Sequence, residues 1–89
     1  MEITEIKIFA VDEKRVKAYS SVVFDDCFIV RDLKVIQGDS KLFVAMPSKK
    51  MKDGSYRDTV HPLNNNMRSK LETSILEAYD KELKKKKMQ

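Results

Sequence analysis

The sequence has few of the residues on which most catalytic and metal sites depend. Its 89 residues include one histidine, one cysteine, two glycines, two prolines and no tryptophan. A catalytic triad or a histidine-based metal site needs more partners than His61 alone can provide, and two glycines cannot form a glycine-rich phosphate-binding loop. Asp53 and Asp58 are conceivable as an acid–base pair, but a turn and a salt bridge account for them more simply. The sequence therefore predicts no enzyme, no catalytic residue, no metal and no cofactor.

Disulfide bonds and long apolar runs are also missing. Cys27 is the only cysteine, which fits a reducing compartment, and the apolar run that it opens predicts a buried structural thiol. No run approaches the roughly 18 apolar residues of a membrane span. Residues 1–5 lack the basic start and apolar core of a signal peptide. We expect a cytoplasmic protein with no membrane span.

The net positive charge of the chain comes from its second half. Residues 1–44 carry seven lysines and arginines against eight acidic residues, a net charge of −1. Residues 45–89 carry eleven against six, a net charge of +5. Such asymmetry favours a polyanionic partner, although lysines that merely solvate a small domain would give a similar count. The candidate partners are DNA, RNA and an anionic membrane surface.

The length predicts a single domain over residues 1–89, and its first half has the pattern of a sheet. In residues 15–24 the even-numbered side chains, from Val16 to Phe24, form a mainly apolar face. The odd-numbered side chains, from Arg15 to Val23, form a more polar face. Short connections make neighbouring strands antiparallel. Residues 1–46 therefore predict a four-stranded antiparallel sheet with strands at 2–11, 15–24, 27–36 and 42–46.

The third of these strands is apolar on both faces. Strict alternation places Ile29, Leu33 and Val35 on one face, and it places Phe28, Val30 and Ile36 on the other. A strand of this kind is covered on both sides. We expect the helix to cover one face of the sheet and a second subunit to meet part of the other.

Residues 47–62 predict a short β-hairpin, which we call the arm. Pro47 and Pro62 bound it, since proline cannot donate a ladder hydrogen bond. Asp53-Gly54 predicts a tight turn whose two central residues both have positive φ. The side chains expected on the arm are basic or aromatic: Lys49, Lys50, Lys52, Tyr56 and Arg57.

Residues 64–84 predict one amphipathic helix. Asn64-Asn65-Asn66 supplies the N-cap without deciding which asparagine it is. The apolar stripe recurs every four residues and consists of Met67, Leu71, Ile75, Tyr79 and Leu83, widened by Leu76 and Ala78. The basic tail at residues 85–89 is expected to fray. The predicted class is α+β.

The arm and the start of the helix together predict a nucleic-acid surface. Lysine and arginine make charge-assisted contacts to phosphates, and Tyr56 beside Arg57 can stack on a base. The residues predicted to bind nucleic acid are Lys49, Lys50, Lys52, Arg57, Arg68 and Lys70, with Tyr56 for base stacking.

Several motifs resemble one bacterial family. They are the run at 28–38 (FIVRDLKVIQG), the run at 42–50 (LFVAMPSKK), Gly54, Tyr56-Arg57-Asp58 and the segment 61–64 (HPLN). Together they resemble the stage V sporulation protein G family, SpoVG, over nearly the full chain. The resemblance implies a small dimer with an antiparallel sheet and a C-terminal helix. It also implies an effect on septum formation and sporulation, or global regulation through binding of DNA and RNA.

The resemblance also indicates which residues bind and where this chain departs from the family. It implicates the basic region and the C-terminal helix, which here means Lys49, Lys50, Arg57, Arg68 and Lys70. Family members often carry a proline where this chain has Lys52, so we expect a looser and more basic arm. The lysine run at 84–87 is variable in the family.

Two functions remain open from the sequence. The first is a homodimeric regulator that binds DNA or RNA. The second is a protein-interaction module of the cell-division machinery, in which an exposed sheet edge accepts a strand from a division protein and polyanion binding is incidental.

Overall fold

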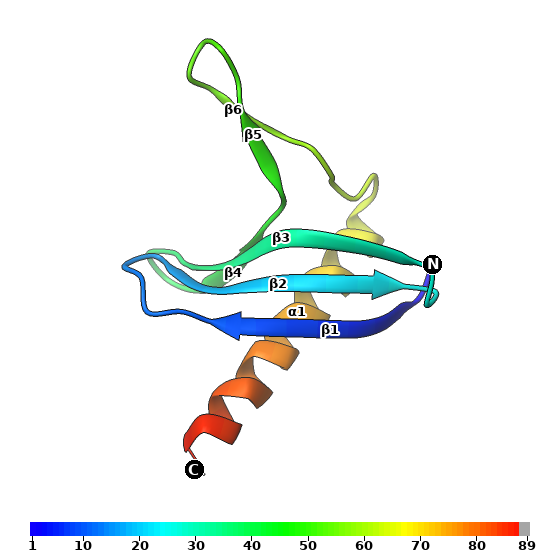
Figure 1. Cartoon of the computed structure of the whole chain (residues 1–89), viewed down its shortest axis with the longest axis vertical. Helices are drawn as coiled ribbons and strands as arrows, with labels where there is room; N and C mark the ends of the chain where they lie inside the picture. Colours follow the sequence, from blue (N-terminus) through cyan, green and yellow to red (C-terminus); the bar gives the residue numbers. More distant parts are fainter. Residues whose placement is uncertain (88–89) are drawn as a thin grey trace.

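The computed structural model describes residues 1–87 and has the predicted α+β architecture (Figure 1). Four strands form one antiparallel sheet in the order β1-β2-β3-β4, so each strand pairs with its neighbour in sequence. Their bounds are Ile3–Ala10 (β1), Val16–Phe24 (β2), Phe28–Gln37 (β3) and Leu42–Ala45 (β4).

The arm and the helix follow the sheet. The arm contains a separate two-stranded sheet, β5 (Ser48–Lys50) and β6 (Tyr56–Asp58), and projects well away from the main sheet (Figure 1). The helix α1 spans Asn65–Lys87.

The helix ends later than predicted. Residues 85–87 are helical rather than frayed, and residues 88 and 89 lie outside the described residues. Lysine is a good helix former, and cationic side chains are favourable at a helix C-terminus. Lys84 also makes an ion pair with Asp80 one turn earlier, with the Lys84 Nζ atom 3.1 Å from a carboxylate oxygen. The same lysine run that suggested fraying therefore continues the helix.

The core lies between the sheet and one face of α1, which crosses behind the sheet in Figure 1. The predicted helix stripe is confirmed, since Leu71, Ile75 and Tyr79 are all buried. The alternation predicted for β2 is confirmed as well, because its even-numbered residues from Ala18 to Phe24 are buried and the residues between them are only partly so. The remaining core side chains come mainly from β3 and β4.

The faces predicted for β3 are wrong, because the strand contains a bulge. Val30 and Leu33 are both buried in the core, whereas strict alternation placed them on opposite faces. Between the pairs Ser20–Leu33 and Val22–Val30 the register shifts, so that β3 has one residue more than β2. Asp32, within this stretch, has a φ of 66°, in the left-handed region. A bulge of this kind changes which face the following side chains occupy.

The connection between β2 and β3 corrects the prediction for Cys27. Asp25 and Asp26 have φ values of 51° and 55°, and the amide of Cys27 donates to the carbonyl of Phe24. Positive φ at both central residues is the geometry of a type I′ turn. Cys27 is the last residue of this turn rather than part of β3, and its side chain is exposed, not buried as predicted.

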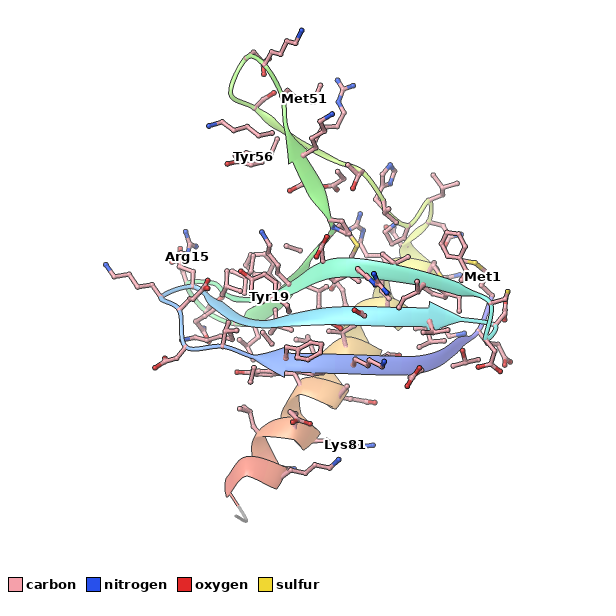
Figure 2. All side chains as sticks on the ribbon, viewed as in Figure 1. Met1, Arg15, Tyr19, Met51, Tyr56 and Lys81 are labelled. Atoms are coloured by element: carbon pink, nitrogen blue, oxygen red, sulfur yellow. The ribbon has the colours of Figure 1, made fainter. Side chains whose placement is uncertain are left out.

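The face of the sheet opposite α1 has apolar residues and no covering element among residues 1–87. Phe9, Ile29 and Phe43 are exposed there, and Figure 2 shows Tyr19 on the same side. Phe9 is paired with Tyr19, and Phe43 with the half-buried Ile36. We call these five residues the outer apolar face.

Within residues 1–87, no helix combines the length and the apolarity that crossing a bilayer requires.

Candidate nucleic-acid interface

The arm presents its side chains to solvent on both faces, because all the residues of β5 and β6 are exposed. Lys49 is paired directly with Arg57, and Lys50 with Tyr56. Directly paired residues share a face of a hairpin and successive residues alternate. One face of the arm therefore holds two cations side by side, and the other face holds a lysine beside an aromatic ring.

The tip of the arm is a three-residue loop instead of the predicted two-residue turn. The amide of Met51 donates to the carbonyl of Ser55, and the amide of Gly54 donates to the carbonyl of Met51. Only Gly54 has positive φ, at 90°, whereas the prediction required it at Asp53 too. This pattern matches a turn followed by a left-handed glycine, the common three-residue hairpin loop.

The side chain of Asp53 ties this loop together. Its carboxylate accepts from the amide of Ser55 at 2.9 Å and from the Ser55 hydroxyl at 2.6 Å. These hydrogen bonds hold the pKa of Asp53 below its usual value. A lowered carboxyl pKa means that the stabilisation is present at neutral pH and is lost as the pH falls through that lowered pKa. The hydrogen bonds of the Asp53 carboxylate therefore favour this loop conformation at neutral pH.

Hydrogen bonds also fix both ends of the segment that returns from the arm to the helix. Thr59 donates to the carbonyl of Pro47 through its amide at 2.8 Å and through its hydroxyl at 3.2 Å, which closes the base of the arm. Among the three candidate asparagines, Asn64 is the N-cap of α1, because its side-chain oxygen accepts a hydrogen bond from the amide of Met67 at 2.8 Å. The cap sets the position of Arg68 in the first turn of α1.

A shallow groove lies between β6 and the start of α1. It is lined by Tyr56, Arg57, Asp58, His61 and Arg68, and we call it the arm–helix groove. Tyr56 is 70% exposed, so most of its ring is free to stack on a ligand. The groove runs along the edge of β6, where Tyr56 and Asp58 belong to one face of the strand and Arg57 to the other, and Arg68 borders it from α1.

The predicted binding residues fall into three places. Arg57, Arg68 and Tyr56 all border the arm–helix groove, and their predicted contact with nucleic acid stays a prediction. A second depression, at the tip of the arm, is lined by Lys49, Lys50, Met51, Lys52 and Asp53.

Lys70 is not part of either site. It lines a depression between β1 and α1 with residues such as Thr4 and Ser74, and its Nζ atom lies 3.5 Å from the carbonyl of Met1. Lys70 thus lies outside the groove that Arg57 and Arg68 border, and its predicted contact with nucleic acid stays a prediction.

His61 borders the groove although it was not among the residues predicted to bind nucleic acid. Its Nδ1 atom lies 3.1 Å from the carbonyl of Pro62, and this contact holds the ring at the bend. Its position directly before Pro62, between the arm and the helix, was the available signal. Within the described part of the chain, no three histidine, cysteine or acidic side chains gather as a metal site.

Comparison with known proteins places the chain in one family. The family model SpoVG matches residues 1–81. A protein of Bdellovibrio bacteriovorus named "Putative septation protein SpoVG" is 63% identical over 84 residues, which cover 94% of this chain and 78% of that protein. A protein of the same name from Anaeromyxobacter sp. (strain Fw109-5) is 54% identical over 85 residues, covering 96% of this chain and 88% of the relative.

The similarity extends to more distant bacteria. The protein of the same name from Acetivibrio thermocellus is 49% identical over 81 residues, covering 90% of this chain and 86% of that protein. The match of the family model spans the sheet, the arm and most of the helix. On these grounds the chain belongs to the SpoVG family.

Proposed function

We propose that this protein is a dimeric regulator that binds DNA or RNA through the arm and the arm–helix groove. The observation that carries the proposal is the groove itself, which Arg57 and Arg68 border together with Tyr56, whose side chain is largely exposed. Cations that contact phosphates and an aromatic ring that stacks on bases are the two parts of a nucleic-acid site. The names of the relatives support a role for this regulator in septation.

The energetics of the arm support an anionic ligand. Lys49 and Arg57 are direct cross-strand partners, and like charges in this arrangement destabilise a hairpin. An isolated two-stranded hairpin is only marginally stable in water, and this one buries none of its strand residues. A phosphate between the two cations would remove their repulsion and hold the arm in place.

The first test is the double variant Lys49→Ala with Lys50→Ala. We expect weaker binding to all sequences, because these lysines contact phosphates rather than bases. The slope of log affinity against log salt concentration should become less negative, by up to about 0.9 for each duplex phosphate that the variant no longer neutralises. Fluorescence anisotropy with DNA and RNA at several salt concentrations measures both effects.

The matched control is Lys14→Ala with Lys41→Ala. These two lysines are exposed in the connections before β2 and before β4, and their removal changes the net charge equally. The control should retain most of the affinity. Equal losses in the two double variants would contradict a specific role for the arm.

The outer apolar face supports the dimeric part of the proposal. A chain of this size buries a small fraction of its surface, and a second copy is an ordinary way to bury more. The single helix covers one face of the sheet, while Phe9, Ile29 and Phe43 are exposed on the other. A two-fold dimer through this face would present two arms to one nucleic acid.

The variant Phe9→Glu tests the dimer. Phe9 is 63% exposed, so the substitution should spare the fold of the monomer. A charge buried between two copies without a partner is costly, and we expect the dissociation constant of the dimer to rise roughly 100-fold. Size-exclusion chromatography with light scattering measures the mass. The control is Thr73→Glu, which adds the same charge at an exposed helix position and should remain dimeric. If the Phe9→Glu variant also remained dimeric, the dimer interface would lie elsewhere on the protein.

One observation favours the second function, an interaction module of the division machinery. β4 is an edge strand and pairs only with β3 in the described structure, so its free edge can accept a strand from another protein. The anisotropy experiment separates the two functions. Binding that disappears without sequence preference as salt rises would favour the interaction module.

A further inference from the structure

The arm–helix groove contains a carboxylate that a simple phosphate site would not need. Asp58 lines the groove together with Arg57 and Arg68. Among the described side chains the one ion pair joins Lys84 to Asp80, so neither arginine neutralises Asp58, although a salt bridge was the simplest prediction for it. Its side chain is exposed, and both carboxylate oxygens can accept hydrogen bonds from a ligand.

A free carboxylate selects the part of a nucleotide that donates hydrogen bonds. It repels phosphate, and it accepts from the N–H groups of base edges. Guanine suits it best, because its Watson–Crick edge presents the N1–H and N2–H donors side by side, facing the two oxygens of a carboxylate. In a duplex these donors are already paired with cytosine. The carboxylate can therefore reach them only where the guanine is unpaired.

The other groove residues complete a nucleotide site around Asp58. Tyr56 follows the arm loop on β6 and has a largely exposed ring on which an unpaired base can stack. Arg57 on the opposite face of β6 and Arg68 on α1 border the same groove and supply charge for the phosphates on either side of that base. Figure 2 shows Tyr56 on the projecting arm, away from the main sheet, where an unpaired strand has access.

We propose that the arm–helix groove recognises one unpaired guanine in single-stranded RNA or DNA, with Asp58 reading its Watson–Crick edge and Tyr56 stacking on the base. This rests on the proposed nucleic-acid function and specifies its ligand. It assigns to Asp58 a role in specificity that a solvated surface carboxylate would not have.

The experiment compares three ligands of one length by fluorescence anisotropy at constant salt. They are a single strand with one central guanine, the same strand with inosine in its place, and the guanine strand annealed to its complement. Inosine lacks the N2 amino group but keeps the rest of the base. We expect the guanine strand to bind about 10-fold more tightly than either other ligand, the discrimination typical of a two-hydrogen-bond base contact.

The variant Asp58→Asn makes the test sharper. Removing a negative charge from a basic surface should raise affinity for every ligand, whereas removing one of two acceptors should abolish the preference for guanine over inosine. The matched control Asp39→Asn removes the same charge from an exposed turn outside the groove. This control should leave the preference intact.

The outcomes separate this inference from the broader proposal. Equal affinity for guanine and inosine, or tighter binding of the duplex, would overturn the inference and leave nucleic-acid binding in place. A preference that survives Asp58→Asn would also overturn it. No binding to any of the three ligands at low salt would overturn both.

Discussion

Replacing Ile75 by alanine is expected to lower the free energy of unfolding by about 2–5 kcal/mol. Ile75 is fully buried on the face of α1 that meets the sheet, so the truncated side chain leaves a cavity that the core can only partly refill. The loss is large compared with the roughly 5–15 kcal/mol that stabilises a typical domain. Chemical denaturation followed by circular dichroism measures it, at a fixed protein concentration because the proposed dimer would contribute to apparent stability.

Thr73→Ala is the control for this substitution. Thr73 is exposed on the same helix, and a substitution there should change stability by no more than about 0.5 kcal/mol. If Ile75→Ala were as stable as this control, the helix could not be packed on the sheet as described. A changed dependence on denaturant would instead indicate an altered unfolded state.

The sequence was sufficient for the elements that depend on local periodicity. The four-residue recurrence along α1 identified the side chains that are buried, including Leu71, Ile75 and Tyr79. The alternation along β2 identified its buried face from Ala18 to Phe24. Both patterns follow directly from backbone geometry, which repeats every 3.6 residues in a helix and every two in a strand.

The β3 bulge could not be predicted in the same way. It depends on how β3 pairs with β2, and no residue near it has a side chain that requires a bulge. Asp32, which adopts positive φ, belongs to a residue type that tolerates this conformation without demanding it. Cys27 was assigned to the core for a related reason, since the apolar run after it led us to begin the third strand at Cys27 and not at Phe28.

The candidate site was predictable in part. Arg57 and Arg68 border one groove because the segment from Thr59 to Asn64 folds back between the arm and the helix, and Pro62 indicated that bend. The separation of Lys70 from the groove follows from helix geometry. Residues two apart lie on nearly opposite sides of a helix with 3.6 residues per turn, so Arg68 and Lys70 could not both point into one groove.

The double variant Arg57→Glu with Arg68→Glu is expected to weaken binding of nucleic acid at least about 100-fold, because each arginine contact contributes roughly 1–3 kcal/mol and each glutamate adds repulsion. Both arginines line the arm–helix groove, one from β6 and one from the first turn of α1. Neither belongs to the buried core. The fold should therefore survive, and circular dichroism with anisotropy on the same sample would show weakened binding in a folded protein.

The control uses the two other arginines of the chain, Arg15→Glu with Arg31→Glu, which produce the same change of net charge outside the groove. If affinity followed net charge alone, the two double variants would bind equally weakly, and the basic surface would be an unspecific polyanion binder. We expect a much smaller effect in the control, because short-range contacts in a groove are screened less by salt than charges far from the ligand. Repeating both titrations at higher salt should narrow the ratio between them, since the control keeps the salt-dependent phosphate contacts that the groove variant lacks.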